Sequence, residues 1–254
     1  KVASPNFALT TSTQTISGTA AQVQGLNGAG NLNNRDKLVD ASTLDSDVLD
    51  ISAIGVGLDR ALVNKIENVN LDIANFDSTT GKGGNLIHST ENYGLEIVDG
   101  KNLDVDGAVV NGSEIVVDAR TTGISSIDLS GTSAVAGSAN STTTADVSTA
   151  TVFKGGSLVD NFTGSNLNDT VTGGAGADDI NAGAGANQIT DAGQGDDNIT
   201  HNTNGATVVG TVTGTGVVDL NASETGATLT AAGVVATMNA AASTAAVTLT
   251  STGA

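Results

Sequence analysis

The sequence contains no cysteine and no tryptophan, and its 254 residues include one proline, one methionine and five aromatic side chains. Without cysteine, disulfides and thiolate metal sites are excluded. The shortage of aromatic side chains excludes a wide central core, because these residues supply much of the area buried in one. Hydrophobic residues still make up 38% of the chain, which is too many for a disordered protein. We therefore expect a thin aliphatic core that repeats along the chain.

Basic residues are also scarce: nine lysines and arginines face 27 acidic residues, which gives a net charge of −18. Lys154 is the last base, so residues 155–254 carry nine acids and no side chain that neutralises them. Phosphate recognition needs clustered bases, so nucleic acid is excluded as a partner and a cation is expected. No run of about 18 apolar residues is present, and we expect no membrane insertion. The first residue, Lys1, leads us to expect a trimmed or excised segment.

A nine-residue repeat runs from Gly155 to Thr200, with five units in register once the extra Asp191 is allowed for. The sixth place is acidic or asparagine in every unit, as Asp160, Asp169, Asp178, Asn187 and Asp197. The eighth place is always large and apolar, as Phe162, Val171, Ile180, Ile189 and Ile199. Composition alone does not explain two columns that follow one rule.

The third unit, GGAGADDIN at 173–181, fits the pattern G-G-x-G-x-D-x-U-x, and the array resembles the RTX nonapeptide family. The resemblance implies a right-handed parallel β-solenoid or β-roll, in which two nonapeptides form one turn. It also implies Ca²⁺ binding at the glycine-rich turns, because Ca²⁺ takes oxygen ligands from carboxylates and backbone carbonyls. The residues that it nominates are the five sixth-place side chains and the glycines Gly174, Gly176, Gly183, Gly185, Gly193 and Gly195.

A turn of eighteen residues would stack each unit on the unit two places away. This pairs Asp160 with Asp178, Asp178 with Asp197, and Asp169 with Asn187, and predicts at least three calcium sites. The neutral Asn187 weakens the third site, and the first two units lack the full G-x-G pattern and should bind poorly. Two alternatives remain. Either the acids only solvate the turns, or a carboxylate pair is catalytic, although a repeated loop suits the pKa shifts of acid–base catalysis poorly.

Short apolar patterns of period two before the repeat predict strands at 69–73, 95–97, 103–105, 115–117 and 127–129. The dipeptides Asp99-Gly100, Asp106-Gly107 and Asn111-Gly112 predict breaks between them.

The spacing of these strands predicts stacked rows of a solenoid. Leu71, Leu95 and Ile115 follow at 24 and 20 residues, and Leu103 and Ile127 at 24. Residues 56–66 carry apolar side chains at helix spacing, so the predicted fold class is all-β with at most one short helix.

A second resemblance lies in the segments Asp47-Val48-Leu49-Asp50-Ile51 and Lys65-Ile66-Glu67-Asn68-Val69-Asn70-Leu71. They are similar to a unit of type I-secreted bacterial S-layer proteins of the Caulobacter and Campylobacter kind. There the unit follows a degenerate RTX loop, which residues 28–38 would provide, and this nominates Asp36 and Asp47 as further calcium ligands. Arg35 and Lys37 argue against a strong site at Asp36. Glu67 is either part of this unit or simply an exposed residue.

The patterns divide the chain into an N-terminal segment with a degenerate loop (1–37), an irregular β-solenoid (38–154), the nonapeptide β-roll (155–200) and an uncharged Val/Thr/Ala-rich solenoid end (201–254). No side-chain charge follows Glu224, which is unusual for the surface of a free monomer. Either another domain or a lattice neighbour covers this end, or the chain is truncated there.

Catalytic motifs are missing from the sequence. With His88 and His201 as the only histidines, H-E-x-x-H cannot occur, and neither G-x-S-x-G nor G-x-x-x-x-G-K-[ST] is present. We therefore expect no enzyme. The resemblances imply a structural, calcium-dependent protein at the bacterial cell surface, exported by type I secretion. Its partners would be copies of itself in a lattice or neighbouring domains, with any surface polysaccharide held outside this chain.

Two other functions stay open. An adhesin or spacer module could use the same solenoid, although five scattered aromatics suit a carbohydrate platform poorly. Ice binding by the ninth-place threonines (Thr163, Thr172, Thr190 and Thr200) is a third hypothesis, which Asn181 and the expected alternation of faces weaken.

Overall fold

The structure is a computed structural model, and it describes residues 6–8, 15–19, 37–40, 46–55, 58, 62–79, 84–88, 93–135, 137–183, 185, 187–190, 196–201, 208–222, 227–239 and 248–251. The described strands form three sheets, and each strand pairs with its neighbours in parallel.

The strands of the eight-stranded sheet are β2 (Thr15–Thr19), β4 (Val48–Ile54), β6 (Asn68–Phe76), β9 (Asn102–Val109), β11 (Ser126–Ala134), β13 (Val152–Lys154), β15 (Thr170–Thr172) and β17 (Gln188–Thr190). Those of the nine-stranded sheet are β7 (Asn85–Ile87), β10 (Glu114–Asp118), β12 (Asn140–Thr144), β14 (Val159–Thr163), β16 (Asp179–Asn181), β18 (Asp196–His201), β19 (Val208–Ala222), β20 (Ala227–Asn239) and β21 (Thr248–Ser251). The four-stranded sheet contains β1 (Asn6–Ala8), β3 (Lys37–Val39), β5 (Leu62–Asn64) and β8 (Glu96–Val98).

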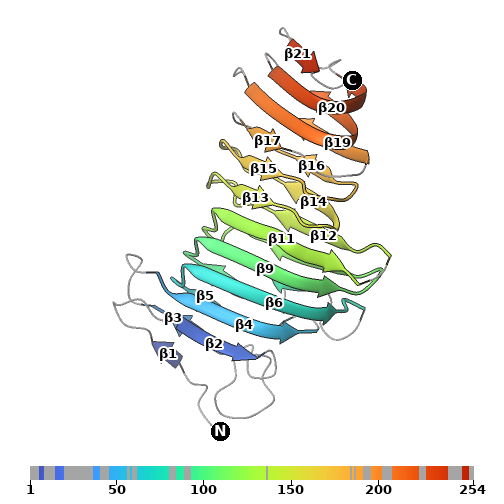
Figure 1. The fold of residues 1–254 in the computed structure, drawn as a ribbon. Helices are drawn as coiled ribbons and strands as arrows, with labels where there is room; N and C mark the ends of the chain where they lie inside the picture. Colours follow the sequence, from blue (N-terminus) through green and yellow to red (C-terminus); the bar gives the residue numbers. More distant parts are fainter. Residues whose placement is uncertain are drawn as a thin grey trace.

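Successive strands from β9 to β18 alternate between the two larger sheets, so each turn of the chain adds one strand to each. Figure 1 shows the strands stacked in sequence order from the N-terminal to the C-terminal end. Such stacking is the topology of a parallel β-solenoid, and the prediction of an all-β fold with parallel sheets is confirmed. In the described part of the chain no helix occurs that is long and apolar enough to cross a membrane.

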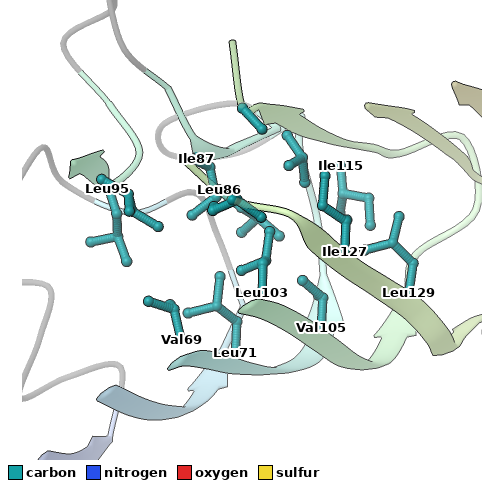
Figure 2. Close-up of a cluster of buried hydrophobic side chains, with 14 of the residues drawn as sticks. Val69, Leu71, Leu86, Ile87, Leu95, Leu103, Val105, Ile115, Ile127 and Leu129 are labelled. Atoms are coloured by element: carbon teal, nitrogen blue, oxygen red, sulfur yellow. The ribbon is translucent and has the colours of Figure 1, made fainter. Parts of the chain in front are cut away.

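Alternation with period two builds the core. One inward-facing row of the eight-stranded sheet consists of residues aligned by strand register and at most 1% exposed: Leu49, Val69, Leu103, Ile127, Phe153, Val171 and Ile189. Figure 2 shows part of this row, with Leu71, Val105 and Leu129, facing Leu86, Ile87 and Ile115. The core is thus the thin aliphatic column that the composition predicts.

The turns of the chain become shorter towards the repeat. Aligned core residues are 34 residues apart at Val69 and Leu103, 24 at Leu103 and Ile127, and 18 at Phe153 and Val171. Strand length falls from nine residues in β6 and β11 to three in β13, β15 and β17. Where the solenoid narrows, Phe153 stacks on Phe162 with ring centroids 4.3 Å apart.

The helical spacing at 56–66 gave a wrong prediction for the described part of that segment. Leu62–Asn64 is strand β5, which pairs with β3 on one side and β8 on the other. Val63 and Ile66 are fully buried, and Lys65 between them has a φ of 61°, where the chain bends. Strand pairing on both sides overrides a local helical pattern, because propensity is the weaker influence.

One of the predicted rows is also wrong. Leu71 aligns with Val105 instead of Leu95, and Ile115 aligns with Ser141. The other row is correct, since Leu103 aligns with Ile127.

The break predicted at Asp106-Gly107 lies inside β9. Gly107 has a φ of +118°, and a Cβ atom there would stand 1.8 Å from the carbonyl oxygen of Ile73. This glycine therefore serves a close approach between β9 and β6 instead of a turn.

The apolar patterns after residue 200 form β19, β20 and β21, as the sequence predicts. These strands extend the nine-stranded sheet beyond β18, so its pairing continues across the segment boundaries proposed at 154 and 200.

Candidate calcium-binding turns

The sixth-place side chains lie where the inward-facing rows reach the turns. In the eight-stranded sheet Asp169 and Asn187 come two residues before the core residues Val171 and Ile189, so period two directs them inward as well. In the nine-stranded sheet Asp160 and Asp178 stand in the same relation to Phe162 and Ile180. Asp160, Asp169, Asp178 and Asn187 are each at most 1% exposed. The repeat thus buries its polar side chains at both edges of the core.

Units two apart stack as the eighteen-residue turn predicts. The backbone N–H of Asp160 donates to Oδ1 of Asp178 at 3.0 Å, and that of Asp169 donates to Oδ1 of Asn187 at 2.8 Å. Asp178 and Asp197 lie side by side in register, and the N–H of Asn198 donates to the carbonyl oxygen of Asp178 at 2.8 Å. The side chain of Asp197 lies outside the described residues, as do Gly193, Gly195, Asp191 and Asp36.

Four of the nominated glycines are needed for their backbone conformation. The φ angles are +102° at Gly174, +158° at Gly176, +70° at Gly183 and +102° at Gly185. A Cβ at any of these positions would stand 1.9–2.3 Å from a carbonyl oxygen of the turn beneath. Only glycine allows this backbone and this approach.

These close approaches gather oxygen atoms between turns. The carbonyl oxygens of Gly155 and Gly156 face Gly174, and that of Leu158 faces Gly176. Oδ1 of Asp178 lies on the same side of Gly176 as the Leu158 oxygen, 2.7 Å from where a Cβ would stand. A buried carboxylate with backbone carbonyls around it is the donor set that Ca²⁺ prefers. The residues of the third unit and of the turn beneath it therefore fit this ion.

Asp160 in the first unit has partners from the protein itself. Its carboxylate accepts hydrogen bonds from the hydroxyl of Ser141 and, at 2.9 Å, from the N–H of Gly156. Burial raises the pKa of Asp160, and these two hydrogen bonds oppose that change by stabilising the charged form.

Asp169 in the second unit is held in the same way. It accepts from the N–H of Thr151 at 2.7 Å and from the N–H of Ser165 at 2.8 Å, and the Ser165 hydroxyl adds a third bond at 2.7 Å. Burial again raises the pKa of this carboxyl, against the effect of the three donors. The first two units therefore compensate much of the buried charge without a metal ion.

Side chains alone do not make a metal site in the described residues. No group of three or more His, Cys, Asp or Glu side chains lies together there in an arrangement that could hold an ion. A cation in these turns would take most of its ligands from backbone carbonyls.

The N-terminal half contains an equivalent that the sequence reading missed. Asp47 and Glu67 come two residues before Leu49 and Val69 in the same inward row, and they are 0% and 1% exposed. Oε2 of Glu67 accepts the backbone N–H of Asp47 at 2.9 Å, and Oε1 lies 3.7 Å from Nζ of Lys101. Glu67 is thus not an exposed residue. Its place two residues before a core valine is the signal that could have revealed this.

The ninth-place threonines do not form one surface. Thr163 and Thr200 belong to the nine-stranded sheet and align with Asn181, whereas Thr172 and Thr190 align with each other in the eight-stranded sheet. This is the alternation that weakens the ice-binding hypothesis.

No family model, no curated protein and no solved structure matches the chain.

Proposed function

We propose that this chain is a structural segment of a secreted bacterial surface-layer protein that folds and assembles on extracellular Ca²⁺. The observation that carries the proposal is the stacking of glycine turns at eighteen-residue intervals, with buried carboxylates beside inward-facing carbonyl oxygens. The RTX-like repeat and the S-layer-like segments support the same function. The localisation is the bacterial cell surface, reached by type I secretion.

Calcium dependence follows from the charge of the repeat. Residues 155–254 carry nine acids and no base, so compaction without a cation brings like charges together. For an extracellular module a Kd near 10⁻⁴ M is ordinary, and about 1 mM calcium then contributes roughly 1.4 kcal/mol for each bound ion. Three ions would supply about 4 kcal/mol, a large share of the stability of a domain. At cytosolic calcium this contribution disappears, which suits a chain that is exported unfolded.

Assembly with copies of the same chain, or with neighbouring domains, is the expected role of the C-terminal end. The thirty residues after Glu224 carry no side-chain charge. A partner that covers them would remove from water a surface with little to keep it soluble.

Electron microscopy of the negatively stained protein, with calcium and after chelation, tests the proposal. We expect ordered two-dimensional arrays in calcium that dissolve in chelator and re-form when calcium is restored. Isolated rods that are indifferent to calcium would contradict the lattice and favour the adhesin or spacer module.

A further inference from the structure

The side chain of Asn187 closes the turn 182–187 with hydrogen bonds of its own. It is completely buried. Its Nδ2 donates to the carbonyl oxygen of Ala182 at 2.9 Å and to that of Gly183 at 3.4 Å, while Oδ1 accepts the N–H of Asp169 at 2.8 Å. Only one orientation of the amide fits these partners, because the N–H of Asp169 requires an oxygen and the two carbonyls require a donor.

The turns of the first two units offer the opposite group to the sixth place. There the residue four positions back presents its N–H to a carboxylate, Gly156 to Asp160 and Ser165 to Asp169. In the fourth unit the residue four positions back, Gly183, presents its carbonyl oxygen to the amide. The positive φ of Gly183, which Gly156 and Ser165 do not share, accompanies this reversal.

The third unit combines the glycine conformation of the fourth with the charge of the first two. Gly174 and Gly176 have positive φ, like Gly183 and Gly185, but the sixth place is Asp178. A carboxylate has no proton to donate to carbonyl oxygens, so a cation must stand between them. An amide needs no such ion.

We propose that the Asn187 amide takes the place of a cation in the turn 182–187, so that this turn closes without calcium while the turn 173–178 depends on it. The inference deepens the calcium-dependent function proposed above and rests on it. It predicts that the identity of the sixth-place residue, carboxylate or amide, sets the metal dependence of a turn with positive-φ glycines.

The test is Asn187→Asp in the full chain, with Gln188→Glu as its matched control, because both add one negative charge and Gln188 is exposed. In chelator we expect Asn187→Asp to melt at least about 3 °C below the wild type, and calcium to remove most of that difference. Isothermal titration calorimetry should detect one more bound calcium ion in Asn187→Asp than in the wild type. Gln188→Glu should behave as the wild type in both conditions.

The reciprocal variant Asp178→Asn keeps the proposal testable if Asn187→Asp does not fold in chelator. It supplies the amide to the third turn and should melt above the wild type in chelator, with one calcium ion fewer. The inference is overturned if Asn187→Asp melts like the wild type in chelator, if it loses equal stability with and without calcium, or if Asp178→Asn gains nothing. Failure of the proposed function looks different: the wild type itself would show no response to calcium, while the comparison in chelator would still test the amide.

Discussion

The acids of the repeat continue rows that are apolar or neutral in earlier turns. In the nine-stranded sheet one inward row passes from Ile115 to Ser141 and then to Asp160, and Asp178 follows one turn later. A buried carboxylate costs several kcal/mol unless it is paired or hydrogen-bonded. Asp160 obtains donors from Ser141 and Gly156, on the neighbouring strand and in its own turn. Calcium dependence should therefore concentrate at the third unit, beyond the turns that the protein satisfies by itself.

Two neighbouring substitutions in the third unit separate a ligand from a surface charge. Asp178→Ala and Asp179→Ala remove the same charge, but Asp178 is buried and Asp179 is exposed. In a calcium titration followed by circular dichroism, we expect Asp178→Ala to raise the midpoint at least about tenfold, equivalent to about 1.4 kcal/mol. Asp179→Ala should leave it within about twofold. Equal midpoints for the two variants would show that the sixth-place column is not the binding column.

At the scale of strands, the repeat could be predicted because its turns have one length. A fixed spacing of eighteen residues makes the partner of every residue known, and the pairs Asp160 with Asp178 and Asp169 with Asn187 were predictable from it. The positive φ of Gly174 and Gly183 was also predictable, since the motif needs glycine there.

The irregular half could not be aligned in this way. Its turns range from 20 residues between Leu49 and Val69 to 34 between Val69 and Leu103, so spacing does not identify partners. The row through Leu71, Leu95 and Ile115 failed for this reason. The burial of Glu67 and the amide role of Asn187 depend on which backbone groups face them, and no residue pattern encodes that directly.

An outward-facing acidic group on β9 and β11 provides a pH-dependent test at the same scale. Asp104 lies beside Asp128 in register and two residues from Asp106. Its pKa is raised by partial burial and by repulsion from Asp106 and Asp128. A carboxyl whose pKa is raised on folding stabilises the fold below its unfolded pKa, and this contribution is lost as pH rises through the folded pKa.

Asp104→Asn should therefore be more stable than the wild type near pH 7 and lose that advantage near pH 4. We expect an increase in Tm of about 1–3 °C at the higher pH, measured by thermal denaturation in constant calcium. A constant difference at both pH values would assign the effect to something other than this charge.

The whole molecule is one continuous stack with two kinds of turn. Below Phe153 and Phe162 the turns are long and their core is aliphatic, and above them the turns shorten to eighteen residues and polar side chains enter the buried rows. Hydrogen bonds from Ser141 to Asp160 and from Thr151 to Asp169 join the two parts. The lower part thus offers a folded template on which the repeat can form turn by turn when calcium is present.

Hydrogen exchange of the intact chain, followed by mass spectrometry with calcium and in chelator, tests this account most directly. Protection of an amide reports the free energy of opening its local structure. We predict that β6, β9 and β11 are equally protected in both conditions, whereas β16 and β18, which flank the third unit's turn, are protected only with calcium. Equal protection of β16 and β18 with and without calcium would contradict the claim that this repeat folds on the ion.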